Sequence, residues 1–189
     1  TGKQYCSLVD YNAPKTLPAT RRTSAEGLMF LAGAYIGDGW TRKWNGKTKK
    51  AVVFGINEKK YEKLKSYLGS HTITEERTCK KVTICDTKLA NFLISEFGSG
   101  AASKTLPAWV FAHPQRHLLL EGYLTTDGHI TDNGFSASTI SRRLAYGIAS
   151  LANSCGYAAS VGYCEMPKTT AIEGRTVNQK PFYQVRAFH

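Results

Sequence analysis

Acidic residues, paired cysteines and long apolar runs are what this sequence has little of. Its 189 residues include 14 Asp and Glu against 25 Lys and Arg, a formal net charge of +11, which favours a polyanionic partner. None of the five cysteines stands in a C-x-x-C pair, which argues against a disulfide framework and a zinc site. No apolar run approaches the ~20 residues of a membrane span. The first residues also lack the order of a signal peptide, so we expect an intracellular protein, cytoplasmic or nucleoid-associated.

The chain contains the same landmarks twice. The tetrapeptide KTLP occurs at Lys15–Pro18 and at Lys104–Pro107, and each copy begins 23 residues before an aspartate that a glycine follows, Asp38 and Asp127. Two landmarks in one register predict two related halves. The predicted units are an N-terminal extension at 1–22 with the first KTLP block, a first half at 23–103 and a second half at 104–189.

Hydrophobic spacing predicts the order α-β-β-α-β-β-α in each half, hence an α+β fold with two antiparallel sheets. Asn45-Gly46 has the residues of a tight hairpin turn, and the segment 165–180, with its Thr, Pro and Gly, is expected to be a loop or an irregular hairpin tip. Helices are expected at about 25–37, 58–69, 88–97, 115–125 and 139–154, and extended segments at about 40–57, 72–87, 129–138, 157–164 and 181–188.

Small residues predict that the two helices preceding the aspartates pack together. Gly33 and Gly37 lie four apart on one helix face, and the second helix has small residues at the matching places. This spacing lets two helix backbones approach closely. If the helices lie side by side in parallel, Asp38 and Asp127 emerge together at the interface of the two halves.

The stretches LAGAYIGDG (31–39) and LEGYLTTDG (120–128) resemble the name motif of the LAGLIDADG homing endonucleases. The second stretch and SKTLPAWV (103–110) are similar to the forms found in endonuclease domains carried inside inteins. The resemblance implies a monomer with internal pseudo-twofold symmetry, paired motif helices and antiparallel sheets that form a DNA-binding saddle. It also implies cleavage of both strands of a long, asymmetric target across the minor groove. Both a free-standing enzyme and an intein-encoded domain fit the residues.

Phosphodiester hydrolysis at such a site requires a divalent cation, which carboxylate oxygens hold. Asp38 and Asp127 supply one carboxylate each, and the main-chain carbonyls of Gly37 and Thr126 add neutral oxygens. The expected cofactor is Mg²⁺, or another divalent cation such as Mn²⁺. Because two bare carboxylates repel each other, asparagine at either position is expected to raise thermal stability without Mg²⁺.

A cation beside each carboxylate would stabilise charge on the reacting phosphate. Lys104 is the first candidate, because it stands in the lysine block that the family resemblance covers. Lys180 follows Asp127 along the chain much as Lys104 follows Asp38, and it is the preferred partner of the second site. Lys15, with its KTLP block in register, remains the alternative.

Recognition of double-stranded DNA is expected from the sheets, since an antiparallel ribbon fits the major groove. Residues 1–110 hold 18 of the 25 Lys and Arg but also 9 of the 14 acids, so we expect the first half to contribute more of the salt-dependent affinity. The candidates are Arg42, Lys43, Lys47, Lys49, Lys50, Arg77, Lys80 and Lys81 in the first half, and His129, Asn133, Ser136, Ser138, Arg175, Asn178, Gln184 and Arg186 in the second.

The leading hypothesis is therefore a site-specific, Mg²⁺-dependent DNA endonuclease. An RNA maturase or a catalytically decayed nucleic-acid-binding protein would share the fold and the charge. The presence of both Asp38 and Asp127 favours the enzyme. A structural or interaction domain with a basic surface is the third class, and it predicts no salt-dependent binding to duplex DNA.

Overall fold

A computed structural model describes residues 25–43, 49–165, 169–172, 175–178 and 180–189. The predicted N-terminal extension, with Lys15, and the candidate DNA contact Lys47 lie outside these residues. Among the described helices, none has the length and apolarity needed to cross a membrane.

The first half has the element order that its sequence predicts, α-β-β-α-β-β-α. Its four strands form one antiparallel sheet in the order β1-β2-β4-β3. The elements are α2 (Ala25–Asp38), β1 (Gly39–Lys43), β2 (Lys50–Ile56), α3 (Glu58–Leu64), β3 (Thr72–Glu75), β4 (Lys80–Ile84) and α4 (Thr87–Phe97).

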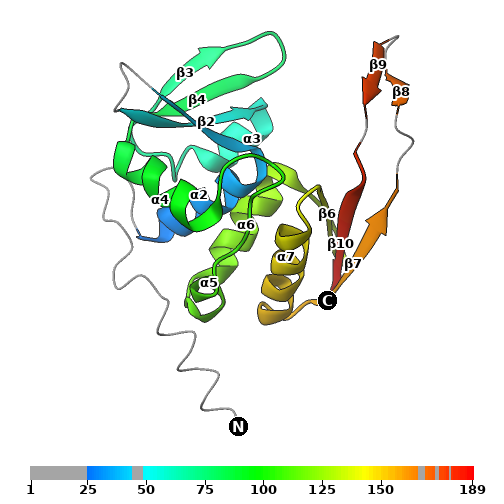
Figure 1. Cartoon of the computed structure of the whole chain (residues 1–189). Helices are drawn as coiled ribbons and strands as arrows, with labels where there is room; N and C mark the ends of the chain where they lie inside the picture. The colour runs from blue at the N-terminus through cyan, green and yellow to red at the C-terminus, as the bar shows by residue number, and fades with distance from the viewer. Residues whose placement is uncertain (1–24, 44–48, 166–168, 173–174, 179) are drawn as a thin grey trace.

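The second half repeats the paired strands but not every helix. Its main sheet has the order β5-β6-β10-β7, and the β8-β9 ribbon projects beyond β7 and β10 from the segment expected to be a loop or hairpin tip (Figure 1). β10 ends at Phe188, and the described residues of the second half contain no counterpart of α4 after it. The elements are α5 (Trp109–Ala112), α6 (Arg116–Asp127), β5 (Gly128–Thr131), β6 (Gly134–Thr139), α7 (Arg142–Ser154), β7 (Ala158–Cys164), β8 (Thr169–Ile172), β9 (Arg175–Asn178) and β10 (Phe182–Phe188).

Helices α2 and α6 lie side by side in the centre, with one main sheet on either side (Figure 1). Their backbones approach so closely that a Cβ added to Gly33 would lie 1.9 Å from the Leu119 carbonyl oxygen. A Cβ on Gly122 would lie 2.0 Å from the carbonyl oxygen of Phe30. The predicted close packing of the two motif helices is confirmed.

Each main sheet presents one face to the helices and one away from them. In β2 the side chains of Val52, Phe54 and Ile56 belong to the core and are fully buried. In β10 the alternate residues Val185 and Ala187 do the same. Because side chains alternate along a strand, the residues between these core residues face away from the helices. Their partners on the neighbouring strands share this outer face.

Candidate active site

The aspartates stand where the ends of α2 and α6 touch. A Cβ added to Gly37 would lie 2.1 Å from Thr126 Oγ1 and 3.1 Å from Asp127 Cβ. Each aspartate ends its helix, and the glycine after it begins a strand at once. A Cβ on Gly39 would lie 2.5 Å from the Tyr35 Cα, so this tight turn excludes a side chain. The structure thus brings Asp38 and Asp127 together.

Lys60 on α3 links the two helix ends, and sequence analysis did not single it out. Its Nζ lies 2.6 Å from Asp38 Oδ2 and also donates a hydrogen bond to the carbonyl oxygen of Thr126, the next-to-last residue of α6. The side chains of Lys60 and Asp38 are 31% and 28% exposed, so the pair is shielded but reachable from solvent. In the sequence Lys60 is one of several lysines in a run typical of a solvent-facing helix, and nothing local distinguishes it.

Asp127 has no such partner, because no described Lys or Arg forms an ion pair with it. Asp127 is exposed at the surface, but the protein packed around its carboxyl first, and the nearby Asp38 carboxylate second, raise its pKa above the ordinary value, while Lys60 and Lys104 oppose the rise. The helix starts explain the difference. In α3, Asn57 accepts a hydrogen bond from the Lys60 backbone N–H, and in α7 Ser141 accepts one from that of Leu144. Leu144 therefore occupies the position in the second half that Lys60 occupies in the first.

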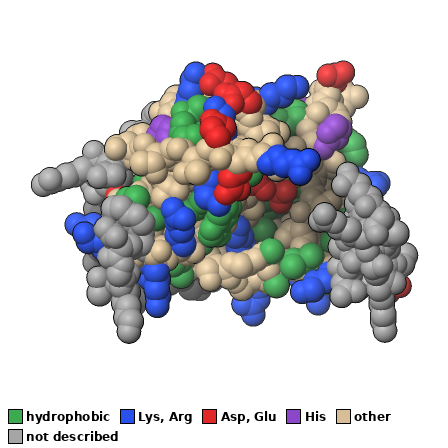
Figure 2. Space-filling view, turned by 90° about the horizontal axis from the view of Figure 1, so that it is seen from above, with side chains coloured by type: hydrophobic (Ala, Val, Ile, Leu, Met, Phe, Trp, Pro, Cys, Tyr) green, Lys and Arg blue, Asp and Glu red, His purple; other side chains and the backbone are tan. Residues whose placement is uncertain are grey.

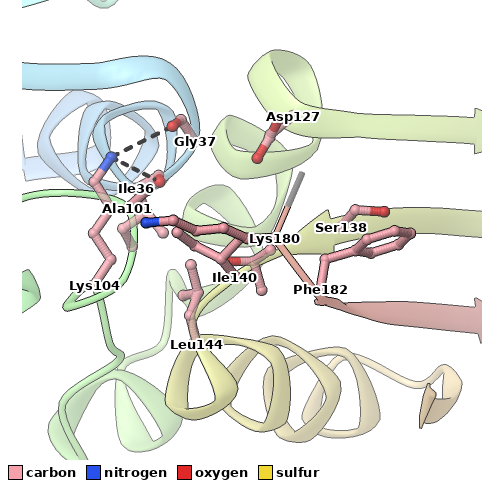
Figure 3. Close-up of a pocket in the computed structure, with 11 residues that line it drawn as sticks. Ile36, Gly37, Ala101, Lys104, Asp127, Ser138, Ile140, Leu144, Lys180 and Phe182 are labelled. Carbon is pink, nitrogen blue, oxygen red and sulfur yellow. Dashed lines mark hydrogen bonds between the residues drawn. The ribbon is translucent and has the colours of Figure 1, made fainter. Parts of the chain in front are cut away.

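Lys104 holds the carboxyl-terminal end of α2. Its Nζ donates to the carbonyl oxygens of Tyr35 at 2.7 Å and Gly39 at 2.9 Å. It also donates to those of Ile36 at 3.0 Å and Gly37 at 3.4 Å, the two bonds drawn in Figure 3. A cation at this end complements the helix dipole. The residue is 5% exposed, and burial lowers the pKa of its ammonium to about 8. These hydrogen bonds stabilise the backbone that carries Asp38.

A cavity of about 360 Å³ brings three predicted catalytic residues to one place. Asp127, Lys104 and Lys180 all line it, and Figure 3 shows them around the same hollow. Lys180 is exposed. A second hollow of about 310 Å³ is lined by Lys60, Thr126, Asp127 and residues of β5 and β6, and it shares Asp127 and Ser138 with the first. Seen from above, acidic side chains lie near the middle of the molecule with basic ones beside them (Figure 2).

The residues fit a cation that keeps much of its water. The described part of the chain contains no cluster of three or more His, Cys, Asp or Glu side chains, so a closed cage of protein ligands is not formed. Asp38 and Asp127, with the carbonyls of Gly37 and Thr126, offer a few hard oxygens. Mg²⁺ keeps several of its own water ligands and is held by few protein oxygens, so this small set of ligands suits it.

The first sheet divides its predicted DNA contacts between two faces. Arg42 faces away from the helices, where it donates to Thr83 Oγ1 at 3.5 Å, and Lys81 shares that face by strand pairing. Lys50 and Lys80 point to the helix side, bonded at 2.8 Å to Asn91 of α4 and at 2.7 Å to Glu58 of α3. The exposed candidates Lys43, Lys49 and Arg77 lie, in order, on β1, before β2 and in the β3–β4 turn.

Trp40 is a further residue of the outer face that sequence analysis missed. It directly follows the first motif and is 40% exposed. A Cβ added to Gly55 of the neighbouring strand would meet its ring at 3.4 Å, so the indole lies over the sheet. A tryptophan directly after the motif was the available signal in the sequence.

In the second sheet, five of the predicted DNA contacts lie on one face. His129, Ser136 and Arg186 form one row across β5, β6 and β10, and Ser138 with Gln184 forms the next. All five lie on the face turned away from α7, and the hollow beside Lys60 is lined by three of them. The other candidates are Asn133 in the exposed β5–β6 turn and Arg175 and Asn178 on β9.

No family model matches the sequence. Among curated proteins, the chain is 28% identical over 192 residues to the ATP-dependent DNA helicase Hel308 of Thermococcus kodakarensis, and the match covers 92% of this chain but 16% of that protein. The chain therefore spans about a sixth of the curated relative that it matches.

Solved structures of homing endonucleases share the fold. I-DmoI in complex with DNA and Mn matches with a TM-score of 0.58 at 14% identity, over 87% of this chain and 90% of that one. The homing endonuclease I-WcaI, bound to its DNA recognition sequence, matches with a TM-score of 0.51 at 13% identity, over 94% and 86%. The predicted fold class is confirmed, and the architecture is that of known DNA endonucleases.

Proposed function

We propose that the chain is a site-specific endonuclease that hydrolyses both strands of duplex DNA, one at Asp38 and one at Asp127, with divalent cations held at these two carboxylates. The observation that carries this proposal is the meeting of the two carboxylates at the touching ends of α2 and α6. Its support comes from the fold, which is that of homing endonucleases solved with DNA and with Mn, Ca or Mg.

Each residue of the site has a defined task in this proposal. Asp38 and Asp127, with the carbonyls of Gly37 and Thr126, hold the cation, for which Mg²⁺ is the first choice and Mn²⁺ the second. When bound, the cation activates water and stabilises the leaving oxygen. Lys180, an exposed cation beside Asp127, offsets negative charge on the phosphate.

Lys104 acts through the backbone. Its bonds to the carbonyls of Tyr35 and Ile36 near the end of α2 and to that of Gly39 at the start of β1 keep Asp38 in place, so it positions a ligand of the cation. The KTLP lysine of the N-terminal extension, Lys15, remains an alternative cation for the second site.

In this proposal the protein binds DNA as a monomer, through the outer faces of its two main sheets. Arg42, Lys81 and Trp40 on the first sheet differ from the His129–Ser136–Arg186 row on the second. Because unlike faces contact unlike bases, the target is long and asymmetric. Arginine, histidine and serine side chains suit base edges and phosphates alike.

We also propose an intein-associated origin and an intracellular location beside DNA. The second motif and SKTLPAWV resemble intein-borne endonuclease domains. The match to a segment that makes up 16% of a longer protein is compatible with a domain inserted into a host chain.

Selection from a randomised duplex library tests the function. The protein is incubated with Mg²⁺ or with EDTA, beside the double variant Asp38→Asn/Asp127→Asn, and the ends are sequenced. We expect Mg²⁺-dependent cuts at one sequence with short 3′ overhangs, absent with the variant. Cutting that is equal in EDTA or in the variant would overturn the proposal.

A nucleic-acid-binding protein without cleavage, such as an RNA maturase, is the second candidate. The observation that favours it is the engagement of Asp38 by Lys60, which leaves one carboxylate free of an ion pair. In the same selection it predicts enrichment of a bound duplex without cuts, or, for a maturase, binding to folded RNA in preference to DNA.

A further inference from the structure

The ammonium of Lys60 contacts two oxygens that the sequence assigns to a divalent cation. One is Asp38 Oδ2, at 2.6 Å from Lys60 Nζ. The other is the main-chain carbonyl oxygen of Thr126. These oxygens come from the ends of two different helices, and a positive charge placed between them offsets both the carboxylate and the negative end of the α6 dipole.

The contacts of Lys60 differ from those of the Lys65–Glu62 and Lys81–Glu76 ion pairs at the surface. Lys65–Glu62 and Lys81–Glu76 link neighbouring positions of one helix or one hairpin. Lys60 instead joins α3 to the junction of α2 and α6, and it also lines the hollow that contains Asp127. Its position is fixed by the start of α3, where Asn57 accepts a hydrogen bond from the Lys60 N–H at 3.0 Å.

From this geometry we propose that Lys60 is an internal cation that holds the Asp38 and Thr126 oxygens in the metal-free protein, and that a divalent ion binds there by displacing it. The inference rests on the proposed metal-dependent function. Ammonium and Mg²⁺ seek the same hard oxygens, and two cations on one oxygen pair repel each other. Lys60 therefore weakens metal binding at Asp38 and keeps the two helix ends together until metal arrives.

Within the described residues Asp127 lacks such an ion pair, and the nearest comparable contact is that of Lys104 Nζ with the Gly37 carbonyl oxygen at 3.4 Å. Leu144, in the position that corresponds to Lys60, lines the cavity beside Asp127 with an apolar side chain. Asp127 has no competing ammonium in ion-pair contact among the described residues. The two carboxylates are thus expected to differ in metal affinity, with the Asp127 side taking the cation at the lower concentration.

Mn²⁺ binding in the absence of DNA tests the proposal, with the free ion counted by electron paramagnetic resonance. The background variant Asp127→Asn leaves Asp38 as the carboxylate of the junction. Within it we compare Lys60→Met with Lys60→Arg, and with Lys59→Met as the matched control. Lys59 is the exposed neighbour of Lys60 on α3, so its replacement removes the same charge without touching the oxygens.

We expect Lys60→Met to tighten Mn²⁺ binding about 5- to 10-fold over the background, the size of one ion pair of modest strength. Lys60→Arg and Lys59→Met should stay within about twofold. Without metal, Lys60→Met should lower the Tm, and Mn²⁺ should restore more of it than in the parent. The Tm pair also verifies that the variant is folded.

Two results would overturn the proposal in distinguishable ways. If Mn²⁺ binds but Lys60→Met binds it no more tightly than Lys59→Met does, Lys60 is no competitor, and the metal-dependent function stands. If neither the wild type nor any variant binds Mn²⁺ with or without duplex DNA, the proposed role of Lys60 as an internal cation and the proposed metal-dependent nuclease fail together.

Discussion

The ends of α2 and α6 carry the same Asp-Gly pair in unlike electrostatic surroundings. Asp38 is paired with Lys60 at 2.6 Å, whereas Asp127 is held next to an apolar cavity wall and has a raised pKa. The carbonyls at the two ends differ as well, since those of α2 bind the buried Lys104 and that of Thr126 binds the half-exposed Lys60.

This difference teaches that a duplicated motif repeats positions but not chemistry. The glycines and aspartates place two carboxylates at one junction. The side chains that surround them come from α3, α7 and the segment before α5, which are not identical in the two halves. The two sites are therefore related in geometry and unequal in charge.

The largest expected effect on stability comes from separating α2 and α6, because their contact brings the two aspartates together. Gly122→Val places side-chain atoms where a Cβ alone would lie 2.0 Å from the Phe30 carbonyl oxygen. We expect a loss of about 3 kcal/mol in the free energy of unfolding, measured by urea denaturation. Gly162→Ala is the control, because the nearest atom to its Cβ would be 4.0 Å away. Equal stability of the two variants would contradict the close packing.

Removing one carboxylate at a time shows whether the two sites act on separate strands. Asp38→Asn and Asp127→Asn should each lower double-strand cleavage by about 100-fold or more. Each should leave nicking of one strand, and the two variants should spare opposite strands. A plasmid carrying the selected target reports nicked and linear forms, with Asp132→Asn in the β5–β6 turn as the control. Loss of both nicks in either variant would mean that the carboxylates form a single centre.

The two lysines of the Asp127 cavity should separate stability from activity. Lys104→Met leaves buried carbonyls of α2 without their donor, which we expect to cost about 2 kcal/mol of stability. Lys180→Met should change stability by less than about 0.5 kcal/mol while it lowers cleavage. Denaturation curves and single-turnover rates on both variants measure the two effects. A stability loss at Lys180 as large as that at Lys104 would refute the division.

Replacement by asparagine should stabilise the metal-free protein at one aspartate and not at the other. Sequence alone predicts that asparagine stabilises at either position, but Asp38→Asn also removes the ion pair with Lys60. We therefore expect a Tm higher by a few degrees for Asp127→Asn in EDTA, and no gain for Asp38→Asn. Scanning calorimetry at neutral pH measures both.

The same pair of variants has a defined pH dependence. Because the pKa of Asp127 is raised in the folded state above its ordinary value of 3.8, the folded protein binds this proton more tightly than the unfolded chain does. Its destabilisation is fully present above the folded pKa and fades as the pH falls toward 3.8. The advantage of Asp127→Asn should shrink on acidification. An advantage that grows toward pH 4 would contradict the sign of the shift.

The smallest effect concerns the DNA-binding faces. Arg186→Ala should lower the slope of log affinity against log salt by about one, the value of one lost phosphate contact. Lys80→Ala should leave the slope unchanged, because Lys80 is engaged with Glu58 and Glu75 on the helix side. Salt titrations by fluorescence anisotropy compare the two. The converse result would place the DNA on the other face of the sheets.

Much of the fold could be predicted because its causes are local or repeated. The period of apolar residues predicts α2 and α6, Gly33 and Gly122 predict their close contact, and the repeat predicts two sheets. The roles of Asp38 and Asp127 stay predictions, as do the exact boundaries of the halves.

What tertiary structure alone decided is which charges meet. Lys60 is separated from Asp38 by a hairpin and from Thr126 by 66 residues. Lys104 contacts the carbonyls of α2 although the whole first half lies between them in the sequence. Lys50 and Lys80 point to the opposite side of the sheet from Arg42 because of the strand register. Sequence by itself determined the motif helices, the glycines and the paired carboxylates, since these depend on backbone periodicity and sterics. The cations beside them depend on through-space Coulomb contacts between segments distant in the chain, and those exist only once the sheets and helices have packed.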